Sequence, residues 1–290
     1  MGEVAPGQFC IQRLTPSLAV SHFYPFIQSG ALLMRILTVV ATVLAVSIAP
    51  VHADELTPLP PPAPRPYPYR ILDIQPGQIS TEVIPQIESH LGGELSPMVR
   101  QQVVTAPNGR QFEADLTVGY ETAAVSIYTT MGDEPFESVK LITGTPVLDG
   151  RVISIARRIR KPNAELPEPA EVLAQLAELY GEPTWLLPDG TFGLEAMYVW
   201  TKDGQMPQQT EQPCGYTGYD GYAFDDQRPP DEHPECLAVL SMQYHSKAGQ
   251  SSLSFDLYDL DLARMDVAET DRQIKAAVAD GTVKPSDMKL

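Results

Sequence analysis

The chain has 290 residues, with 37 acidic against 20 basic side chains and a formal net charge of −17. A chain this acidic repels nucleic acid and anionic membrane surfaces, so we expect no nucleic-acid partner. Its length allows one large domain or two small ones.

The first segment with a clear physical character is an apolar run near the amino terminus. Met34 and Arg35 lead into 14 consecutive apolar or small residues, Ile36–Ala49. This run is shorter than the roughly 20 residues that cross a bilayer. With the small residue Ala53 behind it, the pattern predicts a signal peptide over residues 34–53 that is cleaved after Ala53. The alternatives are an uncleaved anchor and a buried helix.

This signal has consequences for the rest of the chain. Residues 1–33 would be an upstream extension, with either Met1 or Met34 as the true start. The mature protein would be periplasmic or secreted, with no stable membrane span after cleavage. Cys10 would be removed, which leaves Cys214 and Cys236. Two cysteines in an exported chain most simply form one disulfide, and closing a loop of this length would add roughly 3 kcal/mol of stability.

The segment that follows the signal is rich in proline. Seven prolines fall within residues 57–68, and such a run favours an extended polyproline II conformation. We therefore predict a proline-rich disordered spacer over residues 54–70. The alternative is a PxxP ligand for a partner domain.

A first α+β unit is predicted over residues 71–160. Apolar residues recur at helical spacing between Ser80 and the Gly92-Gly93 stop, but Pro85 favours a short or late-starting helix. His90 would lie at the helix end, where a cationic imidazole interacts favourably with the negative pole of the helix dipole. We expect this role rather than metal binding, because no second ligand is near in sequence. The apolar residues of this helix are Val83, Ile84, Ile87 and Leu91.

Strands follow this helix. Asn108-Gly109 between two apolar runs predicts a hairpin, with strands over 98–106 and 111–120. The alternation changes parity at residues 121–124, which predicts a bulge or a turn there. A further strand begins at Val139. In the last strand, residues 151–160, the alternation places Ile153, Ile155, Arg157 and Ile159 on one face, with Arg157 expected at the edge of the core.

A second unit is predicted over residues 161–290. Its helix begins at Pro169 and ends at Gly181, with an apolar stripe of Val172, Leu173, Leu176, Leu179 and Tyr180. Strands are expected over 185–187, 192–200, 237–245 and 253–260, and a final helix over 266–279. The fold class is therefore α+β: two tandem units, each of a helix plus an antiparallel meander sheet, with a C-terminal helix.

The two helix ends carry a resemblance to known proteins. They read His90-Leu91-Gly92 and Leu179-Tyr180-Gly181-Glu182-Pro183. The second resembles the helix close of many exported bacterial proteins of uncharacterised function. The tandem helix-plus-sheet repeat is similar to the unit of β-lactamase-inhibitor proteins and small outer-membrane-assembly lipoproteins, although that unit has two short helices and one is found here per repeat. The resemblance implies protein binding through a concave sheet, and no catalysis.

The insertion between Cys214 and Cys236 is the most unusual segment. It repeats Gly-Tyr three times, and Phe224 follows the third repeat within the insertion. Tyrosines on a glycine-rich loop are typical of recognition surfaces, because they offer a large contact area with few rotatable bonds. The alternative is that the rings fold inward as a local core. The candidate binding residues are Tyr216, Tyr219, Tyr222 and Phe224.

The same insertion is acidic. Asp220, Asp225 and Asp226 are weak candidates for a calcium site, because hard cations prefer several oxygen ligands. The other acids, Asp231, Glu232 and Glu235, lie beside His233. Their spacing does not match an EF-hand loop, and solvated acids in an acidic protein need no metal. We therefore expect no metal and no cofactor.

The sequence contains none of the common catalytic signatures, such as a nucleophile elbow, a Walker loop or a paired CxxC, so we name no catalytic residue. We expect an exported envelope protein that acts as a non-catalytic binding module for an envelope protein partner. The alternative is a periplasmic hydrolase or calcium-dependent protein that uses the acidic loop 220–235.

Overall fold

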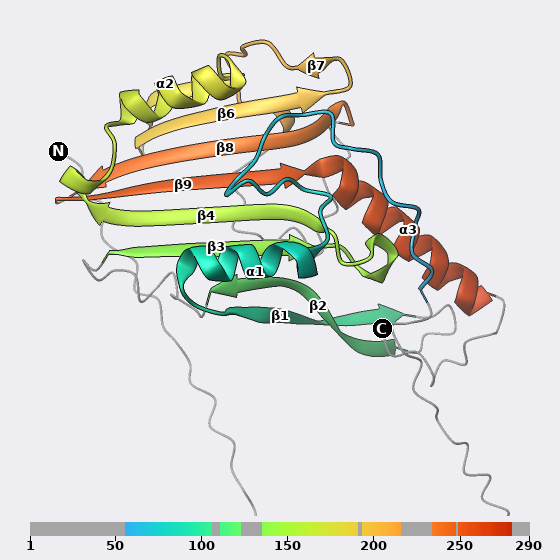
Figure 1. Ribbon diagram of the computed structural model, residues 1–290. Helices are drawn as coiled ribbons and strands as arrows, with labels where there is room; N and C mark the ends of the chain where they lie inside the picture. The colour runs from blue at the N-terminus through green and yellow to red at the C-terminus, as the bar shows by residue number, and fades with distance from the viewer. Residues whose placement is uncertain are drawn as a thin grey trace, which may run out of the picture. The chain divides into compact units, whose positions relative to one another are not determined.

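The computed structural model describes residues 56–105, 111–122, 135–190, 193–215, 234–247 and 249–279. These residues form a nine-stranded antiparallel sheet with three α-helices, including one at the carboxyl end (Figure 1). The predicted α+β class, with an antiparallel sheet and a C-terminal helix, is confirmed.

The chain contains the same succession of elements, a helix followed by antiparallel strands, two times. Each half begins with a helix and continues as an antiparallel meander. The first half consists of α1 (Ser80–Leu91), β1 (Leu95–Thr105), β2 (Gln111–Thr122), β3 (Phe136–Thr143) and β4 (Val152–Pro162). The second consists of α2 (Pro169–Tyr180), β5 (Trp185–Gly190), β6 (Gly193–Thr201), β7 (Gly204–Gln205), β8 (Cys236–Lys247) and β9 (Gln250–Asp259), and α3 (Leu260–Ala279) follows. Short 3-10 turns are η3 (Pro146–Leu148), η4 (Asn163–Glu165) and η5 (Pro213–Gly215).

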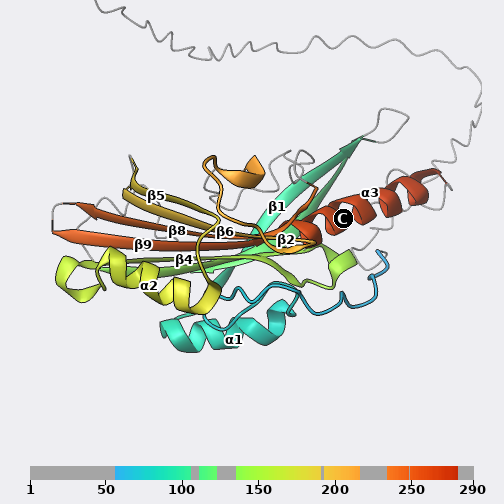
Figure 2. The same ribbon diagram turned by 90° about the horizontal axis from the view of Figure 1, so that it is seen from above.

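The two meanders join into one sheet through their last strands. The spatial order is β1-β2-β3-β4-β9-β8-β6-β5, with β7 on β6. Strands β4 and β9 pair antiparallel over nine residue pairs, from Ser154↔Tyr258 to Pro162↔Gln250. Helices α1 and α2 lie on the same side of this sheet, and α3 continues from the end of β9 (Figure 2).

Helix α1 starts earlier than Pro85 led us to expect. It runs unbroken from Ser80 with Pro85 inside it, so the expectation of a short or late-starting helix is wrong. Proline removes only one amide donor here, and the burial of Val83 and Ile87, each 1% exposed, outweighs that loss. The predicted stop is confirmed: Gly92 has a φ of 67° and its amide donates to Glu88 at 2.9 Å.

Two core clusters lie on opposite faces of the sheet, and a bulge divides β4 between them. The register of β3 and β4 shifts between Ile142 and Thr143. Val152 and Ile155 therefore pack into the cluster beneath α1 and α2, which we call the helix-side core, whereas Ile153 packs into the second cluster, the rear core. The prediction that Ile153 shares a face with Ile155 is wrong because one extra residue reverses the alternation.

Helix α2 matches its predicted bounds. Pro169 occupies its first turn, Gly181 follows its end, and Val172 and Leu176 are buried. Leu179 was expected on the same stripe but is 67% exposed. The face of this helix that contacts the sheet is therefore narrower than the apolar spacing predicted, and it includes Val172 and Leu176 but not Leu179.

Helix α3 begins six residues earlier than predicted. It starts at Leu260, directly after β9, rather than at Asp266. The Asp259 carboxylate accepts the Leu262 amide at 2.7 Å, which satisfies an amide that the first helical turn leaves without a partner. The sequence reading took Leu260 as the end of a strand and so missed this cap.

The segment predicted as a disordered spacer is packed against the body, which corrects that prediction for its described part, residues 56–70. The Leu59 amide donates to the Val147 carbonyl at 2.8 Å. Tyr67 and Tyr69 are 2% and 0% exposed and belong to the helix-side core. The segment runs along the side of the sheet that carries α1 and α2 (Figure 2). Its two tyrosines bury enough apolar area to hold the segment on the sheet.

Candidate recognition surface

The face of the sheet opposite α1 and α2 carries residues in three rows that run across the strands. Two rows are polar and partly exposed, and the third, which includes Met197 of the rear core, is largely buried. Alternate residues such as Leu141, Ile155 and Leu253 belong to the helix-side core, so the residues between them face the other way. The paired registers place these residues in rows. The rows are Phe136–Arg160–Ser252–His245, Ser138–Arg158–Ser254–Gln243–Glu195–Leu187 and Lys140–Ala156–Asp256–Ser241–Met197–Trp185. We call this surface the open face.

The open face has a basic end and a mixed end. Lys140, Arg158 and Arg160 lie on β3 and β4, within a chain whose net charge is −17. The Arg160 guanidinium lies 4.9 Å from the centre of the Phe136 ring, a distance typical of a cation–π contact. Glu195 and the half-exposed Leu187 occupy the other end. Serine and glutamine side chains fill the middle, so the surface offers many hydrogen-bonding groups on a rigid frame.

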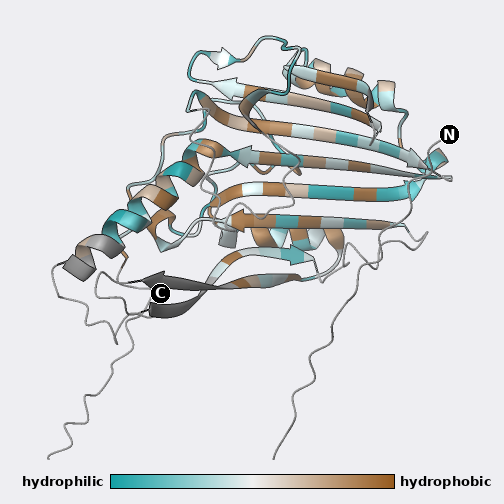
Figure 3. Cartoon of the chain, turned by 180° about the vertical axis from the view of Figure 1, so that it is seen from behind, coloured by the Kyte–Doolittle hydropathy of each residue, from teal (hydrophilic) through white to brown (hydrophobic). Residues whose placement is uncertain are grey.

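The rear core adjoins the open face on the same side of the sheet. The next row along the strands includes Tyr258, Val239 and Val199, which are buried in the rear core. Residues of α3, including Leu262 and Ala263, complete this cluster. In Figure 3, the hydrophilic residues gather toward the strand ends away from α3. The face thus changes from apolar and covered to polar along the strands.

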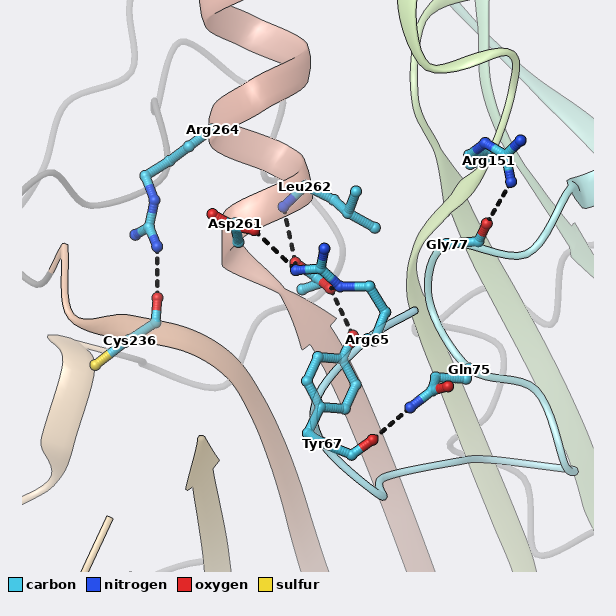
Figure 4. A network of polar contacts seen from close by, with 10 residues as sticks. Arg65, Tyr67, Gln75, Gly77, Arg151, Cys236, Asp261, Leu262 and Arg264 are labelled. Carbon is cyan, nitrogen blue, oxygen red and sulfur yellow. Dashed lines mark hydrogen bonds and ion pairs between the residues drawn. The ribbon is translucent and has the colours of Figure 1, made fainter. Parts of the chain in front are cut away.

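The predicted disulfide is confirmed and lies in the rear core. The sulfur atoms of Cys214 and Cys236 are 2.03 Å apart, and the two residues are 2% and 0% exposed. Arg264 of α3 donates to the Cys236 carbonyl, which ties the start of β8 to this helix (Figure 4). The Gly-Tyr insertion therefore has both of its ends on the side of the sheet that carries the open face.

The residues proposed from that insertion lie outside the described part of the chain. They are Tyr216, Tyr219, Tyr222 and Phe224, with Asp220, Asp225, Asp226 and His233. Their role stays a prediction. Within the described residues, no group of three or more His, Cys, Asp or Glu side chains could hold a metal ion. The same residues contain no helix with the length and apolar character that a bilayer crossing requires.

A smaller polar cluster lies on the helix side of the same basic strand end. Glu137 accepts from Arg157 Nε at 2.7 Å and lies 2.8 Å from His90 Nε2. Partial burial acts to raise the pKa of Glu137, but the hydrogen bonds to Arg157 and His90 outweigh it and leave the pKa below its usual value. Arg157 thus sits at the edge of the core as predicted, and His90 bridges the end of α1 to β3.

A buried ion pair holds the amino-terminal segment to the junction of β9 and α3. Arg65 Nε lies 2.7 Å from Asp259, whose side chain is 0% exposed, and another guanidinium nitrogen donates to Asp261 at 2.9 Å (Figure 4). The Tyr67 hydroxyl donates to Asp259 at 2.6 Å. Burial raises the pKa of Asp259 even though Arg65 acts to lower it. This cluster is internal, and we assign it a structural role.

Sequence reasoning missed both the open face and the buried ion pair. The open face had a visible signal, because Arg158 and Arg160 alternate with apolar residues and β9 alternates serine with apolar residues. The ion pair joins residues 194 positions apart, and no local pattern connects them.

In comparisons with known proteins, no family model, no curated protein and no solved structure matches this chain.

Proposed function

We propose that this protein is a non-catalytic binding module of the cell envelope, and that its recognition surface is the open face together with the disulfide-anchored Gly-Tyr insertion. One observation carries the proposal. Two rows of partly exposed polar side chains lie on a sheet face beside the buried Cys214–Cys236 disulfide, and the insertion richest in tyrosine departs from that disulfide.

The physical character of the open face supports a binding role. Its side chains project from central strands of a continuous sheet, so the hydrogen-bonding groups are held in place before a partner arrives. Such preorganisation lowers the entropy that association costs. Arginine and tyrosine are the residue types that most often dominate interface energetics. The proposed surface has Arg158 and Arg160 on its strands, and the insertion has three Gly-Tyr repeats in its sequence.

The location is part of the same proposal. The predicted signal peptide at residues 34–53 would export the chain, and disulfides form and persist in oxidising compartments. Mass spectrometry of the native protein should find a chain that starts after Ala53 and contains no free thiol. An intact amino terminus with two free thiols in the mature part would remove the envelope from the proposal.

The binding role is tested with a double variant, Arg158→Glu with Arg160→Glu, immobilised and exposed to envelope extract. Reversing two charges within an interface should weaken capture of a specific partner at least about tenfold. Lys202→Glu is the matched control, because Lys202 is exposed on the turn between β6 and β7. Equal capture by all three proteins would contradict a role for the open face.

The insertion is tested separately with Tyr219→Ala and Tyr222→Ala. Both should leave the melting temperature nearly unchanged and reduce capture. Unfolding of both variants would show instead that the rings form a local core. Melting with calcium and with EDTA distinguishes the alternative function, since a large upward shift with calcium would replace the binding proposal by a calcium-dependent one.

A further inference from the structure

The amino-terminal segment, residues 56–70, lies on the sheet without being one of its strands. Seven prolines fall within residues 57–68, and proline has no amide hydrogen to donate to a neighbouring strand. In the described part of the chain the segment pairs with none of the nine strands. Its release would therefore leave the strand pairs of the sheet intact, and a partial opening of this kind costs less than unfolding of the whole sheet.

The segment is bound to α3 at successive points. The Thr57 backbone both donates to and accepts from the Gln273 side chain, at 2.8 Å in each direction. Leu59 packs against the rear core, and Arg65 pairs with Asp259 directly before the start of α3 (Figure 4). The segment thus contacts α3 near its first turn and again at residue 273.

One carboxylate serves both the segment and the helix. Besides its pair with Arg65, the buried Asp259 side chain accepts from the Tyr67 hydroxyl at 2.6 Å. It also accepts the Leu262 amide of α3 at 2.7 Å. Release of the segment would remove two of these three partners and leave a buried charge, which is costly unless it reaches water or takes up a proton. Opening of the first turn of α3 would supply the water.

The first turn of α3 also closes the rear core around the disulfide. Leu262 and Ala263, 0% and 2% exposed, belong to the same cluster as Cys214 and Cys236. Arg264 donates to the Cys236 carbonyl (Figure 4). Because both cysteines are buried, a reductant thiolate reaches a sulfur atom only when this cover opens.

We propose that the amino-terminal segment is a latch that protects the Cys214–Cys236 disulfide from dithiol reductants. When the segment is docked, α3 is held on the rear core and the disulfide is closed to attack. When the segment is released, the first turn of α3 opens and exposes the sulfur atoms.

The reaction that the latch controls is thiol–disulfide exchange. A thiolate of the dithiol attacks one sulfur atom of the protein disulfide, a mixed disulfide forms, and the other cysteine leaves as a thiolate. The second thiolate of the dithiol then displaces the remaining cysteine. The dithiol becomes a disulfide and loses two electrons and two protons, which the cysteine pair gains.

Tyr69→Ala in the full mature chain tests the latch. The Tyr69 ring lies 5.3 Å from the Tyr180 ring and 6.1 Å from the Trp200 ring, between centroids, and belongs to the helix-side core. Its effect on a disulfide in the rear core therefore has to pass through the segment. Loss of this ring weakens docking, so reduction by excess dithiothreitol under native conditions should become at least about tenfold faster. Alkylation followed by mass spectrometry of the cysteine peptides measures the rate.

Leu253→Ala is the matched control. Leu253 is also buried in the helix-side core, but it lies on β9 toward the end away from α3. The variant lowers global stability, which urea unfolding measures for both proteins, and its reduction rate should stay within about twofold of the wild type. Acceleration of both variants in proportion to their loss of global stability would overturn the proposal, because the disulfide would then be exposed only when the whole sheet unfolds.

Gln273→Ala provides a milder test that keeps the proposal falsifiable if Tyr69→Ala does not fold. It removes both hydrogen bonds to the Thr57 backbone and should accelerate reduction about threefold. Arg272→Ala is its control, because Arg272 is the adjacent exposed residue of α3 and pairs with Glu269 of the same helix. Equal rates for the two variants would contradict the latch.

The reverse effect is a second readout, since coupling between two sites is reciprocal. The Leu59 amide donates to the Val147 carbonyl at 2.8 Å, so its hydrogen exchange reports docking of the segment. Exchange at Leu59 should be faster in the double variant Cys214→Ser with Cys236→Ser than in the wild type, and unchanged exchange would overturn the coupling. These experiments measure disulfide reduction and docking rather than capture of a partner, so their failure leaves the proposed binding function untouched.

Discussion

The two faces of the sheet are covered in different ways. On the helix side, α1, α2 and the amino-terminal segment cover the helix-side core, and Leu141 and Ile155 are 0% exposed. On the other side, among the described residues, the rear core near α3 and the disulfide is buried together with Asp256 and Ser241 beside it, and the two polar rows that follow along the strands are partly exposed. Alternate residues of the same strands therefore have different roles. Those that face the helix-side core stabilise the fold, and those that face the opposite side carry hydrogen-bonding groups.

The comparison also shows that the helix side depends on contacts between segments far apart in sequence. The amino-terminal segment is held there by a buried ion pair, two buried tyrosines and single hydrogen bonds such as that of Leu59 with Val147, rather than by pairing as a sheet strand. Variants on the two faces should accordingly differ in their free energy of unfolding, and the following predictions take them from the largest expected effect to the smallest.

The largest effect is expected for Asp259→Ala. The Arg65 side chain is 8% exposed, and removing its buried partner leaves it paired with the more exposed Asp261 alone. The variant also removes the acceptor of the Tyr67 hydroxyl and the Leu262 amide, so we expect a loss of about 3–5 kcal/mol. Asp261→Ala is the control, because the Asp261 side chain is 37% exposed and an exposed pair contributes at most about 1 kcal/mol. Urea unfolding measures both. Equal losses would show that burial of this ion pair does not decide its contribution.

Asp266 should make stability fall as pH rises. Burial raises its pKa from 3.8 to about 6, although hydrogen bonds from Thr145 act to lower it. Between these values the folded state binds more protons than the unfolded state, so the free energy of unfolding decreases with pH, by at most about 3 kcal/mol. The loss is complete above pH 6. Below pH 3.8 both states are protonated and the contribution is constant.

Asp266→Asn isolates this contribution, because asparagine keeps the shape and removes the titration. The stability advantage of the wild type over Asp266→Asn should shrink from pH 4 to pH 7 in urea unfolding. An advantage that grows over this range would show that the Thr145 hydrogen bonds dominate over burial.

Two tyrosines of the helix side should respond differently to the loss of a hydroxyl group. The Tyr67 hydroxyl donates to Asp259 at 2.6 Å, so Tyr67→Phe should cost about 1.5–3 kcal/mol. The Tyr198 hydroxyl is buried without a hydrogen-bond partner in the described part of the chain, so Tyr198→Phe should be neutral or stabilising by about 1 kcal/mol. Thermal melting of both variants tests the difference. A large loss for Tyr198→Phe would reveal a partner for that hydroxyl.

The smallest effect is expected on the open face. Ser254→Ala should change stability by less than about 0.5 kcal/mol, whereas Leu253→Ala, one residue earlier, should cost about 2–5 kcal/mol because Leu253 is 5% exposed in the helix-side core. Chemical unfolding of this adjacent pair measures the contrast between the faces directly. Similar losses would mean that the open face is packed as tightly as the helix side.

The sequence by itself determined the helices and strands that local physics specifies. The spacing of Val172 and Leu176 with Pro169 and Gly181 around them predicted α2 to the residue, because helix periodicity, the proline start and the glycine stop all act within a few positions. Alternation likewise predicted β6 and β8, and counting cysteines predicted the Cys214–Cys236 disulfide.

Only the tertiary structure decided which strands pair, which rows of the sheet are covered by helices, and where burial outweighs the local preference of proline. The join of β4 to β9, the open-face rows and the ion pair of Arg65 with Asp259 bring together residues far apart in the chain, and local periodicity contains no information on such distances. Proline at residues 57–68 and at residue 85 signalled a detached arm and a broken helix, but the burial of Tyr67, Tyr69 and Val83 outweighed both signals, because the free energy of burial depends on the neighbours that the fold supplies.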